Sequence, residues 1–78
     1  MKSAKEMFKL LGYEYCGNDN SIMYVSSFVE KEVWHLRVVV FNKIYKEWNI
    51  FENINNVSVG IELHKAITKQ MEELGWLE

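Results

Sequence analysis

The chain contains no proline, a single cysteine and only four glycines among its 78 residues. Without proline or clustered glycine, no stretch has the composition of a linker or a low-complexity tract. One cysteine cannot form an internal disulfide, which favours a reducing compartment. No apolar run approaches the roughly 20 residues that a membrane-spanning helix needs, and charges interrupt the N-terminus too early for a secretory signal. We therefore expect one cytoplasmic domain, residues 1–78, without membrane contact.

An excess of charge of either sign is also missing. Nine basic and eleven acidic side chains leave a formal net charge of -2, which gives no long-range attraction for nucleic acid or anionic lipid. The chain is instead rich in apolar and aromatic residues, at 49% and 14%. This composition is typical of a folded globule, and the aromatic residues favour sheet structure. A chain this short buries only about 60% of its unfolded surface, so a partner that adds burial would stabilise it.

The N-terminal segment carries the signals of a short helix. Ser3 and Glu6 have the spacing of a capping box, and apolar residues follow at helical spacing until Gly12. Because glycine adopts the left-handed conformation that ends helices, we expect a helix over Ala4–Leu11. Such a short helix is not stable alone in water and must dock on the rest of the domain.

The C-terminal segment predicts a longer helix. Ser58 is its expected cap, and Gly75 follows its expected end at about Leu74. Trp76, just beyond the helix, is expected to pack as a hydrophobic anchor. The expected buried face consists of Leu63, Ala66, Ile67, Gln70, Met71 and Leu74.

Between the helices, β-branched and aromatic residues predict three strands at about Ser21–Val29, Glu32–Phe41 and Ile44–Phe51. The two-residue gaps at 30–31 and 42–43 predict tight hairpins. Whether Tyr13–Cys16 adds a fourth strand stays open. The expected fold class is α+β: a three- or four-stranded antiparallel β-meander with one N-terminal and one C-terminal helix packed on one face.

The predicted register divides the strand residues between two faces of the sheet. We assign to the helices the face whose central strand is apolar throughout: Met23, Val25, Val29, Trp34, Leu36, Val38, Val40, Tyr45 and Phe51. The second face is also largely apolar, and two short helices can hardly cover both faces. It carries Ile22, Tyr24, Phe28, Val33, Val39, Phe41, Ile44, Trp48 and Ile50, interrupted by Ser26, His35, Arg37 and Lys46.

The same register places Arg37 between Tyr24 and Trp48, flanked by His35 and Lys46. Tyrosine, tryptophan and arginine dominate binding energetics at protein interfaces, so we take these five residues as the candidate interaction face. Three interpretations stay open. The residues are ordinary strand residues, they bind a protein, or they stack single-stranded nucleic acid, which the negative net charge disfavours.

No signature of catalysis or of a bound group is present. His64 and Glu62 are two residues apart and do not share a helix face, so they are not a ligand pair. Glycine-rich phosphate loops and paired general acids and bases are absent as well. We therefore expect no enzyme activity, no metal, no cofactor and no catalytic residue.

The two helical segments, AKEMFKLLGY at 4–13 and ELHKAITKQMEELGW at 62–76, are similar to small uncharacterised proteins of bacteriophages and mobile elements of low-GC Gram-positive bacteria. The resemblance covers both helices and the hydrophobic rhythm between them. It implies a phage- or prophage-related protein of the bacterial cytosol that binds a host protein, such as a component of a defence system. No residue role follows from it.

The sequence thus favours a non-enzymatic binding domain that uses its second sheet face. A homodimer through that face would hide the apolar surface and add burial to a short chain. The competing partner is a host protein, and single-stranded nucleic acid is the third alternative.

Overall fold

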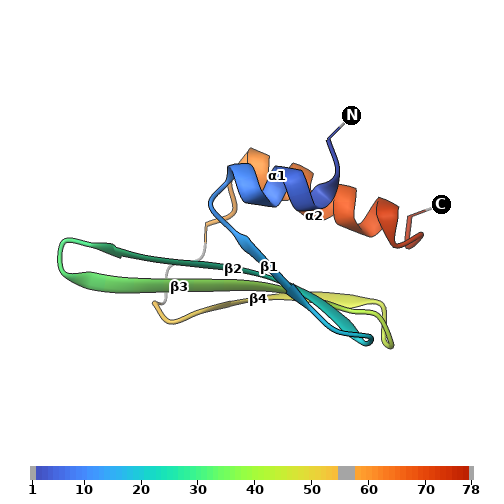
Figure 1. Cartoon of the computed structure of the whole chain (residues 1–78), viewed down its shortest axis with the longest axis horizontal. Coiled ribbons are helices and arrows are strands. Elements are labelled where there is room, and N and C mark those ends of the chain that lie inside the picture. Colours follow the sequence, from blue (N-terminus) through green and yellow to red (C-terminus); the bar gives the residue numbers. More distant parts are fainter. Residues whose placement is uncertain (1, 55–57, 78) are drawn as a thin grey trace.

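The computed structural model describes residues 2–54 and 58–77, which form two helices and four strands. The elements are α1 (Ala4–Leu10), β1 (Glu14–Gly17), β2 (Ser21–Glu30), β3 (Val33–Asn42), β4 (Glu47–Glu52) and α2 (Ile61–Glu73). The strands form one sheet in the order β1-β2-β3-β4, and both helices lie on one side of it (Figure 1). All neighbouring strands are antiparallel. The predicted α+β meander with helices on one face is confirmed.

The segment that the sequence left open is a strand. β1 pairs along its whole length with the first half of β2, from Glu14 opposite Val25 to Gly17 opposite Ile22. The Asn18 side chain closes the hairpin by accepting the backbone N–H groups of Asn20 and Ser21, at 2.8 and 3.0 Å. An asparagine that bonds to the backbone two residues ahead is a turn former, which is why the chain reverses here.

The other two hairpins turn later than predicted. Lys31 and Glu32, with φ of 51° and 65°, form the loop between β2 and β3 in place of residues 30–31. Between β3 and β4 the chain turns over residues 43–46, because Asn42 Oδ1 accepts two backbone N–H groups and Asn42 therefore starts the turn. Both corrections shift the register by an even number of residues. Each residue therefore keeps its face and changes its partner.

Both helices end in the same way. The α1 capping box of Ser3 and Glu6 is present as predicted. At its other end the N–H of Tyr13 donates to Phe8 O at 3.0 Å around Gly12, whose φ is +91°. The equivalent bond after α2 joins the N–H of Trp76 to Met71 O at 2.9 Å around Gly75. This is the Schellman arrangement, in which glycine takes the left-handed conformation.

The start of α2 differs from the prediction. Its N-cap is Gly60, which makes no side-chain cap bond, so the cap predicted at Ser58 is wrong. The loop predicted at 52–56 begins one residue later, because Glu52 still belongs to β4, and its last two residues lie outside the described residues. The buried face predicted for α2 is confirmed: Leu63, Ala66, Ile67 and Gln70 are buried, and Met71 and Leu74 pack against the core.

The core is an aromatic cluster between the sheet and the helices. Phe8 of α1 stacks on Tyr24 of β2, with ring centroids 3.8 Å apart and planes within 8°. Phe41 contacts both rings edge-on, and Trp76 packs on Phe41 at a centroid distance of 6.3 Å, as an anchor should. Aromatic side chains contribute large buried areas, and this is what holds a seven-residue helix in place.

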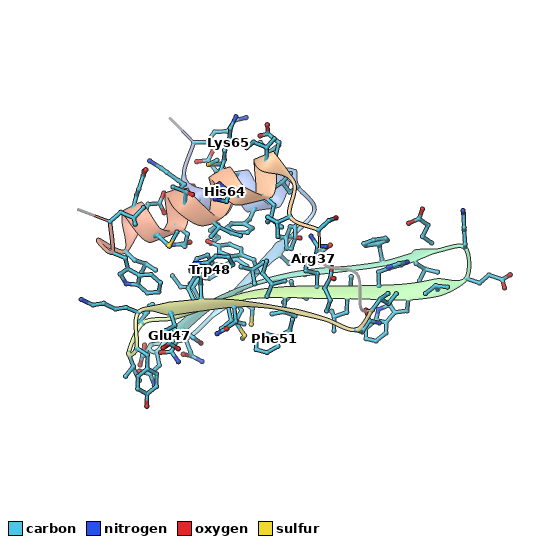
Figure 2. All side chains as sticks on the ribbon, turned by 180° about the vertical axis from the view of Figure 1, so that it is seen from behind. Arg37, Glu47, Trp48, Phe51, His64 and Lys65 are labelled. Carbon is cyan, nitrogen blue, oxygen red and sulfur yellow. The ribbon has the colours of Figure 1, made fainter. Side chains whose placement is uncertain are left out.

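The helices cover the face of the sheet opposite to the predicted one. Tyr24, Val39 and Phe41, which we assigned to the second face, are buried beneath α1 and α2. Figure 2 shows the alternation on β4: Trp48 lies on the helix side, whereas Glu47 and Phe51 point away from the helices. The face with the apolar central strand, Trp34 to Val40, is left uncovered, so the prediction that it forms the core is wrong.

The distribution of polar residues explains this inversion. Ser26, His35 and Arg37 lie on the helix side, but all of them lie in the half of the sheet beyond the buried core residues. The β2–β3 hairpin extends past both helices at that end (Figure 1). Polar residues are therefore segregated along the strands and not between the two faces. An average over a whole face cannot detect that arrangement.

Candidate interaction surface

The uncovered side of the sheet, which we call the open face, presents a continuous apolar surface. Its strand register places apolar residues of all four strands side by side: Cys16, Met23, Val25, Val29, Trp34, Leu36, Val38, Val40 and Phe51. Val29, Trp34 and Phe51 are 69%, 52% and 59% exposed. Monomeric proteins rarely expose contiguous apolar patches of such extent, and a larger patch marks an interaction site.

Polar groups on the open face lie at its margins or are already paired. The indole N–H of Trp34 donates to Ser27 Oγ at 2.8 Å, so this tryptophan presents only apolar atoms outward. Glu14 and Glu47 are the charged strand residues on this face, and they lie at the outer strands β1 and β4. The two central strands carry no charge there, which is the distribution of an apolar interface core with a polar rim.

The five residues of the predicted interaction face do not form one exposed surface. Tyr24 is only 1% exposed, stacks on Phe8 and donates its hydroxyl hydrogen to Gln70 Oε1, so it cannot contact a partner. Its neighbour across β3 is Val39, and that of Trp48 is Phe41, so neither flanks Arg37 as predicted. Lys46 lies in the β3–β4 turn and not in a strand.

Arg37 is held by an ion pair. Its Nε donates to Glu52 Oε1 of β4, directly opposite, and both side chains are largely buried. Burial by itself lowers the pKa of Arg37, but hydrogen bonds with Glu52 and Tyr13 outweigh it, so the pKa is raised and the guanidinium stays charged. The second oxygen, Glu52 Oε2, is buried and meets no hydrogen-bond donor in the described part of the chain. The pair is structural: it neutralises two charges where the helix layer ends.

His35 lies beside this ion pair. Its ring stacks on Phe28 with centroids 4.7 Å apart and planes within 6°. His35 and Arg37 both line a cavity of about 310 Å³, together with Tyr13, Ser26 and Glu52. The structure thus brings together two of the five predicted residues, in a small polar cavity at the margin of the helix layer and not on an open surface.

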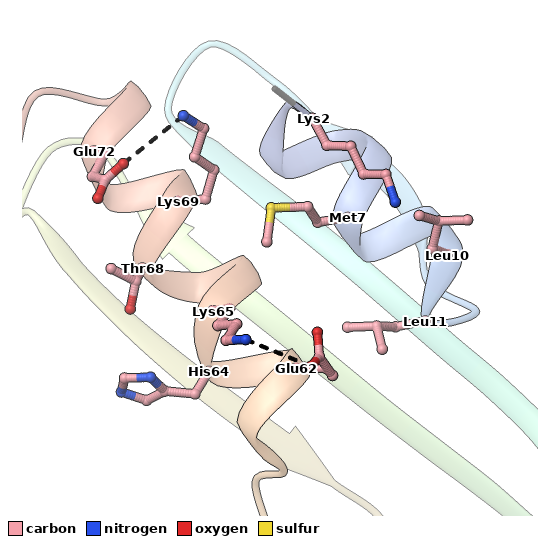
Figure 3. A pocket seen from close by; sticks show the side chains of 10 residues that line it. All are labelled: Lys2, Met7, Leu10, Leu11, Glu62, His64, Lys65, Thr68, Lys69 and Glu72. Carbon is pink, nitrogen blue, oxygen red and sulfur yellow. Dashed lines mark ion pairs between the residues drawn. The ribbon is translucent and has the colours of Figure 1, made fainter.

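A larger hollow lies between the two helices, on the side away from the sheet (Figure 3). Its volume is about 690 Å³, and Met7, Leu10 and Leu11 supply its apolar side. Lys65 and Lys69 of α2 are paired with Glu62 and Glu72 at 3.7 and 3.9 Å. Exposed pairs of this kind contribute little and leave the rim of the hollow nearly neutral.

Within residues 2–54 and 58–77, no group of three or more His, Cys, Asp or Glu side chains is arranged to hold a metal ion. Neither described helix has the length and apolar character of a membrane-spanning segment. Comparison with family models, with curated proteins and with solved structures finds no match to this chain.

Sequence analysis missed two residues that shape the sheet. Glu52 was placed in a loop, although it continues the alternation of Trp48 and Ile50 and could have been assigned to the strand on that signal. Asn53 closes the free edge of β3: its side chain accepts the N–H of Leu36 at 2.8 Å and donates to Trp34 O at 2.9 Å. No local pattern announces this contact, because its two partners lie 17 and 19 residues away.

Proposed function

We propose that the chain is a non-enzymatic protein-binding domain that binds a second copy of itself through the open face. The observation that carries this proposal is the exposure of Val29, Trp34 and Phe51 on a face whose central strands hold no charge. Water disfavours contiguous apolar surface, and burial against a second apolar surface removes that cost. Two sheets pack face to face about 10 Å apart when their inner faces are apolar.

The size of the open face is compatible with such a dimer. β2 and β3 have ten residues each, and β1 and β4 add four and six. At about 3.4 Å per residue and about 4.8 Å between strands, the face covers about 500 Å². Two stacked copies would bury about 1,000 Å², the lower limit for a specific interface. The carboxylates of Glu14 and Glu47 at the outer strands keep contact with water in this arrangement.

A host protein bound to the same face is the second candidate. The resemblance of the two helical segments to phage and mobile-element proteins favours it, and it would place the protein in a bacterial cytosol. Single-stranded nucleic acid is less well supported, because Tyr24 is buried and Arg37 is paired. The strands place carboxylates but no basic residue on the open face, which disfavours a polyanion there.

The test of self-association is the absolute mass in solution, measured by light scattering over a wide range of concentration. We expect a mass above that of one chain that persists in high salt, because apolar contacts are not screened. Val38→Lys or Phe51→Lys places a charge in the open face and should lower the mass. A single-chain mass at every concentration would contradict the homotypic proposal.

Leu10→Lys is the matched control. Leu10 is 68% exposed on α1 and lines the hollow between the helices, so the substitution adds the same charge away from the sheet. We expect it to leave the mass unchanged. If Leu10→Lys lowered the mass and the open-face variants did not, the interface would lie on the helices. Circular dichroism of each variant establishes that the fold is retained.

A further inference from the structure

The outer edge of the sheet at β4 has backbone groups without partners. The N–H of Asn53 donates to Leu36 O, so the backbone of Asn53 is directed toward β3. Because the direction alternates along an antiparallel strand, Trp48, Ile50 and Glu52 direct their N–H and C=O groups away from β3. β4 is the last strand of the sheet, and no backbone bond to these groups occurs among residues 2–54 and 58–77.

Other free stretches of the sheet are shorter or blocked. β1 has four residues and presents the outward groups of Tyr15 and Gly17 only. The exposed end of β3 is closed by the Asn53 side chain. β4 carries neither of two features that protect edge strands, a proline or a lysine within the strand. It is therefore the edge best suited to receive a further strand.

We propose that β4 pairs with β4 of a second copy, antiparallel and about a twofold axis at Asn49. Trp48 then lies opposite Ile50 of the second copy, and these two residues exchange backbone hydrogen bonds on either side of the axis. The sheet continues as β1-β2-β3-β4 followed by the same strands in reverse order. Unpaired edge groups that water solvates in one chain become ladder bonds in the pair.

The side chains of β4 match this register. Trp48 lies on the helix side and remains 37% exposed, although its neighbours Phe41 and Ile50 pack in or against the core. In the pair it lies beside Ile50 of the second copy, so the core continues across the axis, and aromatic–β-branched pairs stabilise adjacent strands. The register also places Lys46 opposite Glu52 of the second copy, whose Oε2 has no donor among the described residues.

Edge pairing acts together with the open face without depending on it. A twofold axis perpendicular to the sheet keeps all helices on one side, so the open faces of the two copies become one surface of about 1,000 Å². Stacking of two such sheets would bury about 2,000 Å², well within the range of stable interfaces. Two perpendicular twofold contacts of this kind give a closed tetramer.

Two variants separate the contacts. Ile50→Pro removes the outward N–H of β4 and leaves the ladder to β3 intact, since proline is tolerated where the N–H faces solvent. Ile50→Ala is its control, because it loses a similar amount of packing but keeps the N–H. We expect a fourfold mass for the unmodified protein, a twofold mass for Ile50→Pro and for Val38→Lys, and a single-chain mass when both are combined.

A folded Ile50→Pro variant with the mass of the unmodified protein would overturn the edge proposal, and so would a single-chain mass of Val38→Lys at high concentration. The face proposal fails separately, when Val38→Lys and Phe51→Lys leave the mass unchanged. Amide hydrogen exchange gives a second readout. Protection of the Trp48, Ile50 and Glu52 amides should rise with concentration in Val38→Lys, in which only the edge contact remains. Unprotected amides in an associated protein would contradict β4 pairing.

Discussion

Tyr24 joins the aromatic core to the C-terminal helix. Its ring stacks on Phe8, and its hydroxyl group donates to Gln70 Oε1 of α2, a buried acceptor that would otherwise have to be desolvated without a partner. Burial, with smaller contributions from Glu73 and Tyr15, raises the pKa of Tyr24 to about 12. The neutral phenol is therefore the form that the folded protein requires.

This pKa predicts a loss of stability in alkali. An unfolded tyrosine ionises at about pH 10, so above that pH the unfolded state binds fewer protons than the folded state and is favoured. The stability contributed by neutral Tyr24 is complete below pH 10 and lost as the pH rises through 12. It amounts to about 2–3 kcal/mol at the alkaline limit. Urea unfolding between pH 8 and 12 measures it.

Tyr24→Phe is the control for this prediction. It cannot ionise, so the alkaline loss specific to position 24 should vanish, while lysines and other tyrosines titrate equally in both proteins. At neutral pH the variant should be less stable by about 1–3 kcal/mol, because Gln70 loses its donor. An identical pH dependence in the two proteins would show that Tyr24 is not protected from ionisation.

At the scale of elements, the sheet depends on side chains that imitate backbone pairing. Asn53 continues β4 beyond its last strand residue by bonding to both Leu36 and Trp34 of β3. Glu73 of α2 similarly accepts the backbone N–H of Ala4 at 2.8 Å and so ties the two helices at the start of α1. Each contact satisfies an end that the regular element leaves unpaired.

Removal of the Asn53 side chain should destabilise the β3–β4 pair. Asn53→Ala loses two hydrogen bonds, and since both are exposed we expect a cost of about 1–2 kcal/mol in the free energy of unfolding. Asn49→Ala is the matched control, because Asn49 is exposed on the same strand and makes no side-chain bond among those of the described residues. Equal costs for both variants would mean that Asn53 contributes nothing specific.

At the scale of the whole molecule, one sheet has two apolar faces and the helices cover part of one. The helices bury Tyr24, Val39 and Phe41 and leave the far end of the β2–β3 hairpin and the entire open face in contact with water. Neighbouring residues of β3 therefore have opposite roles. Val39 is fully buried, whereas Val38 lies on the open face.

This difference predicts unequal costs for the same substitution. Val39→Ala deletes methyl groups from a packed core and should cost about 2–3 kcal/mol in the free energy of unfolding, measured in dilute solution. Val38→Ala should cost less than half as much there, because its site is already partly hydrated. The reverse order would mean that the face with Trp34 to Val40 is the core after all.

The sequence by itself predicted every element, including the capping box at Ser3 and the glycine-ended helices, because these depend on residues within one turn of each other. It also predicted which residues share a face, since alternation survives an even shift of register. The candidate site was less predictable. The set Tyr24, Arg37 and Trp48 required the correct cross-strand partners, and these depend on turn lengths that Asn42 and Lys31 decide locally.

Only the tertiary structure decided which face the helices cover. Both faces are apolar enough to be a core, so hydrophobicity summed over a face does not distinguish them. The decision depends on where apolar residues cluster along the strands: Ile22, Tyr24, Val39 and Phe41 form one compact patch that matches the area of two short helices. The apolar residues of the other face are spread over the whole length of β2 and β3, more than two short helices can cover and suited to the broad surface of another sheet.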